Sequence, residues 1–474
     1  MEARKTFRSW KPREYAHQPV TPAEVLPEDD LVFFLLDVVP QLDLSRIYAY
    51  YERETRGAPP YDVAMMATLL LYAYCVGVFS SRKIAAACER NVAFMAIVGH
   101  QRPDFRTISD FRRIHLEPLS DLFVEVLRLA GEPGMVKLGN LALDGSKFRA
   151  NASRHKAMSY GYMKKEVERL RAEVAALLEQ AERTDAEQDA AWGSRRGDEL
   201  PDELKRHQER LKAIEAAMGR LEEEAKQQAE GKRREREQAR ADRESQGKKP
   251  RGRKPQPISD LPDDKAQTNF TDPEAKVMKT SNKGFDYCIN AQAVVDEPHQ
   301  IIVAAEATSE ANDKQQAVPM VEATLDNLKA AEIELPKEEE HPEAPAKKIP
   351  ISMDSGYFGE NNVKDVETLG VDPHIATGRQ KHNRPLAPEV DGPPPADATV
   401  KEQMAQKLRT PSGRTCYAKR KHIVEPVFGQ IKHARGFRQF LLRGLKNVSA
   451  EWKLLCLTHN LLKIWRYRFA LTQN

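Results

Sequence analysis

The spacing of apolar residues changes at Lys137, and this change constrains the fold more than any other feature. From Asp30 to Gly131 apolar residues recur every three or four positions, which is the period of an α-helix. From Lys137 onward they gather in short runs bounded by glycine or turn residues, which is typical of buried strands. The sequence therefore predicts an all-helical N-terminal domain, residues 31–131, followed by an α/β domain.

The α/β domain is expected to contain a sheet of mixed direction flanked by helices. Its first strand and a later one each end in an aspartate, and the two strands between them are joined by a tight turn that predicts a hairpin. Alternation of strands with helical segments is typical of a layered α/β fold. The expected elements are strands at 138–144, 285–296, 300–308, 349–354 and 374–377, with a helix at 314–329.

A long insertion separates the first strand of this domain from the rest. Apolar residues between Tyr160 and Glu230 step by three and four, with a break at Gly193 to Pro201, so we expect a helical hairpin. Gly231 to Pro255 has eleven Lys or Arg against four acids and almost no apolar residue, which predicts a loosely held basic linker. The expected divisions are the first strand at 137–155, the insertion at 160–255 and the remainder at 270–474.

The net charge of +3 averages segments of opposite sign. Lys401 to Asn474 holds 16 Lys or Arg against three acids and is also rich in aromatic residues. Such a tract suits a polyanion, because Lys and Arg neutralise phosphates and release condensed counterions. A solvated helical surface is the alternative interpretation.

Cysteine usage and the N-terminus indicate the compartment. The five cysteines are scattered without metal-binding spacing, which favours a reducing environment. In the N-terminal tail, residues 1–30, the first residues, Met1 to Lys11, carry charge without the apolar segment of a secretory signal. The most apolar run, Met65 to Phe79, is shorter than the ~20 residues that cross a bilayer, and we expect it to be a buried core helix. These features predict a cytoplasmic protein without a membrane segment.

Two short basic segments of the helical domain are candidates for a helix-turn-helix. Ser81 to Glu89 and Phe105 to Arg113 predict helices, with Asn91 to Asp104 between them. Short basic helices also occur in proteins that do not bind DNA, so both interpretations stay open. The candidate DNA contacts on the second helix are Arg106, Arg112 and Arg113.

Three acids stand out by their positions. Asp144 and Asp354 each follow an apolar strand and precede a glycine-containing turn, so each is expected to face a ligand at the edge of the sheet. Turn formation is the alternative role for Asp144. Glu425 precedes Pro426, which fits only a first helical turn, so it should begin a helix that runs to about Ala434. A favourable interaction with the helix dipole is the alternative for Glu425.

These residues resemble the bacterial insertion-sequence transposases of the DDE type. The resemblance is carried by Asp144 in Leu-Asp-Gly-Ser-Lys, by Asp354 in Met-Asp-Ser-Gly-Tyr-Phe, and by a signature of Tyr, Arg, Glu and Lys around Glu425. It implies a ribonuclease H-like core with the acids on the first strand, the fourth strand and a later helix. The distance from Tyr417 to Glu425 is one residue longer than the usual signature, so either Arg420 or Lys421 fits the phosphate-binding position.

The resemblance also implies an activity and its partners. The three acids would hold Mg²⁺ or Mn²⁺, since carboxylate oxygens suit these hard cations and paired cations stabilise phosphodiester cleavage. The substrate would be double-stranded DNA, as terminal inverted repeats and as target DNA, bound by a homodimer or a larger assembly on the nucleoid. The implied DNA contacts near the acids are Tyr417, Arg420, Lys421, Lys432 and Lys147.

Two alternatives to a transposase stay open. A nuclease of the same fold would use the same acids without joining strands, and a DNA-binding descendant of a transposase would keep the basic surfaces but tend to lose an acid. Asp313, next to Asn312 before the expected helix at 314, could add a fourth acid near the metal, although helix capping fits the pair better. The chain has no glycine-rich nucleotide-binding motif.

Overall fold

The structure is a computed structural model in which the chain forms two compact units. The first comprises Met1–Phe148, Asn290–Phe440 and Lys446–Asn474, and the second comprises Arg149–Ile289 and Leu441–Leu445. The residues that the structure describes are 22–53, 59–99, 101–192, 202–245, 256–280, 282, 284–335, 348–378, 387–395 and 397–472. Most of the tail expected at 1–30 lies outside them, and Pro22–Val25 form the short helix α2.

The N-terminal part of the first unit is helical, as the apolar spacing predicts. Aspartate or asparagine side chains accept hydrogen bonds from backbone amides at the starts of four of its helices. The apolar helix α5 is buried along nearly its whole length, as expected of a core helix. No helix in the described part of the chain is long and apolar enough to cross a membrane. The elements are α3 (Leu31–Val38), η1 (Val39–Gln41), α4 (Ser45–Tyr51), α5 (Val63–Cys75), α6 (Ser81–Arg90), α7 (Val92–Val98), α8 (Phe105–Ile114) and α9 (Leu116–Gly131).

Between the two basic helices α6 and α8 lies a further helix that the sequence analysis did not predict. The helix α7 is capped by Asn91 and ends at Gly99, whose φ of 52° is left-handed. Its apolar residues pack on α5, and α6 packs on both α7 and α8. The basic helices are therefore parts of a compact helical cluster.

A mixed sheet forms the centre of the first unit. Its strands lie in the order β6, β5, β1, β7 and β8, with β1, β7 and β8 parallel and β5 and β6 an antiparallel hairpin, as predicted. One expectation is corrected: β1 does not end at Asp144 but continues to Arg149, because it extends past its parallel pairing with β7 and stays paired with β5. The bounds are β1 (Leu141–Arg149), β5 (Phe285–Asp296), β6 (Ile302–Thr308), β7 (Ile349–Met353) and β8 (Val371–Ile375).

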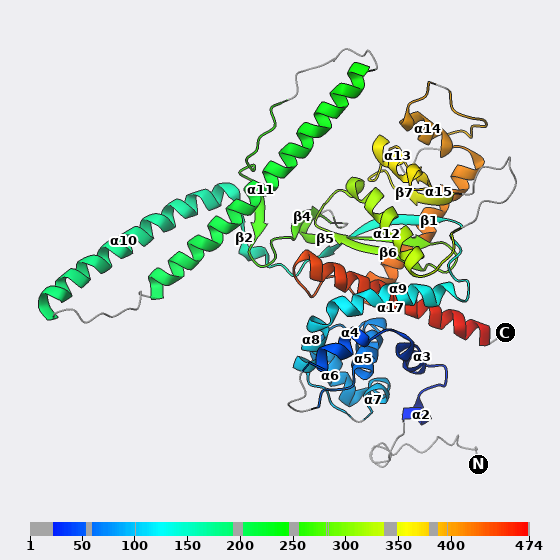
Figure 1. Cartoon of the computed structure of the whole chain (residues 1–474), viewed down its shortest axis with the longest axis horizontal. Helices are drawn as coiled ribbons and strands as arrows, with labels where there is room; N and C mark the ends of the chain where they lie inside the picture. Colours follow the sequence, from blue (N-terminus) through cyan, green and yellow to red (C-terminus); the bar gives the residue numbers. More distant parts are fainter. Residues whose placement is uncertain are drawn as a thin grey trace, which may run out of the picture. The chain divides into compact units, whose positions relative to one another are not determined.

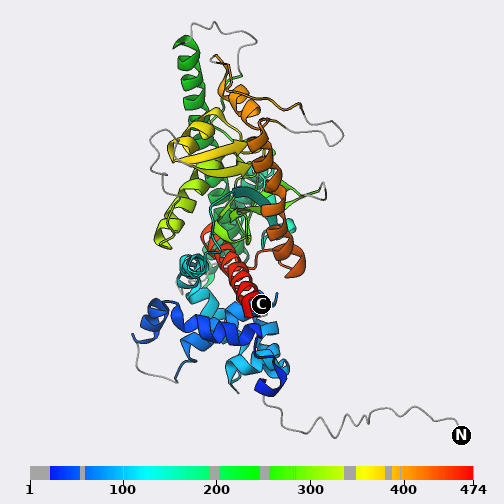
Figure 2. The same cartoon turned by 90° about the vertical axis from the view of Figure 1, so that its right-hand side faces the viewer.

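Helices cover this sheet. The helix α12 packs against β6, α13 and α9. The long helix α17 runs along the sheet, between it and the N-terminal helices (Figures 1 and 2), and its Asn460 makes hydrogen bonds with both backbone groups of Ile302 in β6. The bounds are η3 (Asp313–Gln316), α12 (Ala317–Ala330), α13 (Glu360–Thr368), α14 (Val400–Lys407), α15 (Pro411–Ile423), α16 (Glu425–Gly429), η4 (Gln430–Ala434) and α17 (Leu445–Thr472).

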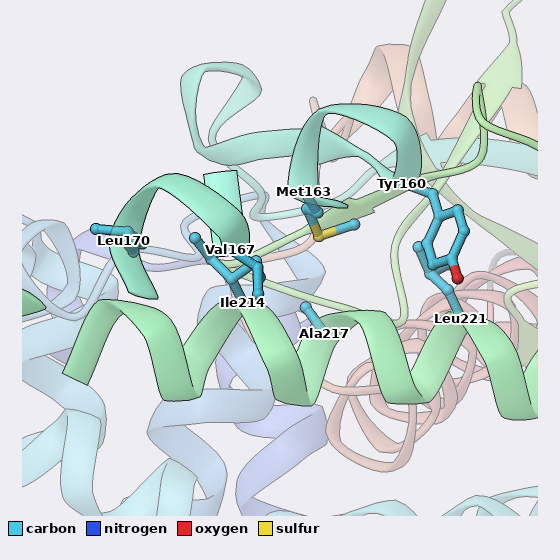
Figure 3. Close-up of a cluster of buried hydrophobic side chains, with 7 residues drawn as sticks. All are labelled: Tyr160, Met163, Val167, Leu170, Ile214, Ala217 and Leu221. Carbon is cyan, nitrogen blue, oxygen red and sulfur yellow. The ribbon is translucent and has the colours of Figure 1, made fainter. Parts of the chain in front are cut away.

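The second unit is built around two long helices. Figure 3 shows α10 and α11 facing each other through buried apolar side chains, among them Met163, Val167 and Ile214. The break expected at Gly193 to Pro201 lies outside the described residues. The bounds are η2 (Arg154–Lys156), β2 (Ala157–Ser159), α10 (Tyr160–Trp192), α11 (Asp202–Ser245), β3 (Gln267–Asn269) and β4 (Lys276–Lys279), and β4 pairs with the first residues of β5.

The basic linker expected at 231–255 is corrected in its first part. Residues 231–245 continue α11 as a helix, and 246–255 lie outside the described residues. Arg, Glu, Gln and Ala all favour helix, and pairs such as Arg240 with Glu244 at 2.8 Å stabilise successive turns. A low apolar content therefore did not indicate irregular structure here.

Candidate active site

Asp144 and Asp354 lie side by side because of the register of two parallel strands. Leu143 of β1 is paired with Met353 of β7, and each aspartate is the next residue. Each carboxylate accepts a local backbone hydrogen bond, from Gly145 at 2.8 Å and from Gly356 at 2.7 Å. Burial raises the pKa of Asp144 to about 6, Arg420 opposes this shift, and the neighbouring charge of Asp354 adds to it.

Arg420 on α15 connects these strands with the C-terminal helices. Its Nη1 donates a hydrogen bond to Asp144 Oδ2 at 2.9 Å, and its Nη2 lies 3.9 Å from Glu425 Oε1. Only 10% of the Arg420 side chain is exposed, so the guanidinium is an internal counterion of the acids. The neighbouring Lys421 is exposed. Of the two residues that fitted the phosphate-binding position from sequence, Arg420 therefore faces the acids and Lys421 faces solvent.

Glu425 begins α16, as the following proline predicts. Its side chain is 54% exposed, in contrast to the partly buried Asp144. The chain then forms the single π-helical turn η4 and leaves it at Gly436, whose φ of 76° is left-handed. The predicted extent of this helical segment, to about Ala434, is confirmed.

Lys432 of the π-helical turn points back to β1. Its Nζ donates hydrogen bonds to Ser146 Oγ at 2.6 Å and to the backbone oxygen of Lys147 at 2.8 Å. The same ammonium group lies 4.2 Å from the centre of the Phe148 ring. Through these contacts Lys432 connects the C-terminal segment to the strand that carries Asp144. Single π-helical turns of this kind are frequent at functional sites.

A fourth acid, Asp313, lies beside the site. Its Oδ1 accepts hydrogen bonds from Asn290 at 2.7 Å and from Gln292 at 2.8 Å, both on β5. A Cβ atom on Gly356, two residues after Asp354, would lie 3.4 Å from Asp313 Oδ2. Asn312 caps η3, as expected for this pair, whereas the Asp313 side chain points to β5 and to the turn after Asp354. The only sequence signal for Asp313 was its position at a helix start after the hairpin, and helix capping was the preferred explanation for it.

The candidate DNA contacts of the helical domain divide into exposed and buried arginines. Arg106 and Arg113 are exposed, each beside a neighbouring aspartate. Arg112 is buried and donates to the backbone oxygen of Phe79 at 2.8 Å, which corrects its expected role as a DNA contact. The sequence itself indicated the burial of Arg112, because this residue falls on the apolar stripe of α8 with Ile108.

A pocket of about 510 Å³ opens next to Arg420. Its lining includes the half-buried Tyr417 and three further basic residues, Arg409, Arg414 and Lys421. A basic pocket with an aromatic side chain suits a nucleic-acid segment, since cations contact phosphates and a ring offers a stacking face.

The donor set is suited to a hard divalent cation. Asp144 and Asp354 supply carboxylate oxygens, the ligands that Mg²⁺ and Mn²⁺ prefer, and they lie side by side on parallel strands. Within the described residues, no three acidic, histidine or cysteine side chains are close enough together to hold a metal ion. The carboxylates of Asp144 and Asp354 fit a divalent cation by their chemistry. Glu425 is separated from this pair by the Arg420 guanidinium, which lies between Asp144 and Glu425.

Two family models match the chain. Residues 21–113 match the transposase domain (DUF772), and residues 393–465 match the transposase DDE domain. No curated protein and no solved structure matches. The two matches support an insertion-sequence transposase of the DDE type, the family that the sequence resembles.

The matched segments cover part of the site. The second includes Arg420, Glu425 and Lys432, whereas Asp144 and Asp354 lie outside both. The hydrogen bond from Arg420 connects Asp144 to the second matched segment, and the strand register places Asp354 beside Asp144.

Proposed function

We propose that this protein is a DNA transposase that cuts DNA at transposon ends and joins the freed ends to target DNA. The observation that carries the proposal is the hydrogen bond from Arg420, in the segment that matches the transposase DDE domain, to Asp144, which lies beside Asp354 on parallel strands. In this proposal the mixed sheet is a ribonuclease H-like core, and α10 and α11 are a helical hairpin inserted between its first two strands.

Asp144, Asp354 and Glu425 would hold Mg²⁺ or Mn²⁺. When bound, the cations would stabilise the negative charge of phosphodiester cleavage and activate the attacking oxygen. Asp144 and Asp354 are held by backbone hydrogen bonds at the carboxyl ends of the paired segments, so their carboxylates are oriented before DNA arrives. Glu425 is the exposed member, and closure on DNA would bring it to the pair.

The protein's basic residues would position the DNA backbone. Lys421 is exposed on α15, and Tyr417 lines the neighbouring pocket, so both are available to the strand that is cut. Lys432 and Lys147 would contact phosphate beside β1, and Arg420 would turn from the acids toward phosphate as the cations bind. In the helical domain the exposed Arg106 and Arg113 would contact the terminal repeats. A dimer or a larger assembly would bind these repeats.

The experiment combines the purified protein, Mg²⁺, labelled DNA with the repeats that flank the gene, and a target plasmid. A transposase yields cut ends and labelled ends joined to the plasmid. Cut ends without joined product would favour the nuclease. Binding of the repeats without cleavage would favour a DNA-binding descendant of a transposase.

A further inference from the structure

A buried glutamine, Gln292, lies beside the candidate active site, next to the strand of Asp144. Gln292 of β5 is fully buried, its Nε2 donates to Asp313 Oδ1 at 2.8 Å, and its Oε1 accepts a hydrogen bond from the hydroxyl of Tyr357. Its backbone oxygen accepts from Trp452 Nε1 at 2.8 Å. The side-chain amide of Gln292 thus donates through its nitrogen and accepts at its oxygen. Only one of its two flipped orientations satisfies both partners.

On one side this network holds the turn that carries Asp354. Tyr357 is fully buried, its backbone N–H donates to Asp354 O at 3.3 Å, and its own backbone oxygen accepts from Asn362 Nδ2 at 2.8 Å. Asn362 also donates to Lys314 O at 2.6 Å, which joins this turn to the loop of Asp313. The position of Asp354 is thus tied to the Tyr357 hydroxyl, three residues further on.

On the other side the network lies directly against the strand of Asp144. A Cβ atom on Gly145 would collide with the amide of Gln292 and would lie 2.8 Å from Asp313 Oδ1. Only a glycine after Asp144 lets the strand approach this closely. Since Gln292 is neutral, its amide can pack against this strand without adding to the negative charge of the nearby carboxylates.

We infer that Gln292, Asp313 and Tyr357, which we call the polar brace, are positioning residues that set the spacing of Asp144 and Asp354 before any cation binds. The inference rests on the proposed function for its purpose. Groups around metal ligands that orient them typically change metal affinity or activity by roughly 10–100-fold when they are removed.

The first test uses Tyr357→Phe, which removes only the hydroxyl, and Tyr74→Phe as a matched control. Tyr74 is also fully buried, and its hydroxyl accepts a hydrogen bond from Arg112 in the helical domain. Hydrogen exchange is measured on the full chain without metal or DNA. We expect faster exchange at residues 354–358 in Tyr357→Phe alone. The inference would be overturned if residues 354–358 of Tyr357→Phe exchanged at the wild-type rate. It would also be overturned if they exchanged equally fast in both variants.

The second readout is the Mn²⁺ concentration that gives half-maximal thermal stabilisation of the same DNA-free proteins. A positioning role predicts an increase of about tenfold in Tyr357→Phe and none in Tyr74→Phe. An unchanged concentration in Tyr357→Phe would contradict the role, because a purely structural hydroxyl lowers stability without changing metal affinity.

A second pair of variants separates the shape of Asp313 from its charge. Asp313→Asn keeps an acceptor for Asn290 and Gln292, so residues 354–358 should keep their protection from exchange, whereas Asp313→Ala should lose it. Equal loss in both variants would overturn the positioning role. If the variants show these exchange patterns but the wild-type protein cuts no DNA, the proposed function is refuted, while the positioning role of the polar brace still holds.

Discussion

Arg420 donates a hydrogen bond of 2.9 Å to Asp144 from a position 276 residues away in the sequence. The pair joins the C-terminal helices to the first strand, and it puts a positive charge where two aspartates lie side by side. A buried ion pair becomes costly when one partner is removed, because the other charge stays buried without compensation. Arg420 therefore contributes to the fold as well as to the site.

Replacing this arginine should destabilise the protein through Asp144. Arg420→Gln is expected to lower the free energy of unfolding by about 3 kcal/mol at neutral pH. Urea unfolding would measure the loss, with the exposed Arg466→Gln as control. In an Asp144→Asn background most of the effect should disappear. An equal loss in both backgrounds would show that Arg420 does not act through Asp144.

The glycine after Asp144 should tolerate no side chain. Gly145→Ala would force a methyl group against Gln292 and Asp313, so loss of DNA cleavage is expected. Gly139→Ala is the matched control before the same strand, because nothing lies within 4 Å of its added Cβ. Cleavage of labelled repeat ends compares the two variants, and equal activity would refute the close packing beside Asp144.

Lys421 should contribute to DNA affinity through charge alone. Lys421→Ala is expected to weaken binding to all DNA sequences alike and to reduce the slope of log K against log salt by about 1. Lys364→Ala, exposed on α13, serves as control. Fluorescence anisotropy at several salt concentrations gives the slopes. An unchanged slope for Lys421→Ala would remove this residue from the DNA interface.

The pH dependence of stability should report the buried Asp296. Burial raises its pKa from 3.8 to about 6, against hydrogen bonds from the amides of Lys137 and Leu138. Because the folded state holds the proton more tightly, the contribution of this carboxyl is fully present below pH 4 and is lost as pH rises through 6. From pH 4 to 7, wild type should lose about 2 kcal/mol relative to Asp296→Asn. A constant difference in urea unfolding would contradict this.

Local patterns in the sequence predicted the helical domain, the hairpin of β5 and β6, and the start of α16 at Glu425. These features depend on periodicity, turn residues and Pro426, which act over a few positions. The extent of β1 past Asp144 could not be predicted in this way, because it depends on pairing with β5, which is distant in sequence.

The site itself was only partly predictable for the same reason. Arg420 and Lys421 are adjacent on a helix and point about 100° apart, so the packing of α15 decides which one reaches the acids. Asp313 and Gln292 acquire their roles only when β5 and the turn after β7 meet. Arg112 differs, since its place on the apolar stripe of α8 was visible in the sequence.

We propose that Asp354 is one of the acids that cut DNA. The decisive experiment is cleavage of labelled terminal-repeat DNA with Mg²⁺, comparing wild type, Asp354→Asn and Asp365→Asn, an exposed aspartate on α13. Wild type and Asp365→Asn should cut the ends, and Asp354→Asn should bind the same DNA without cutting it. Equal cleavage by all three proteins would contradict the assignment.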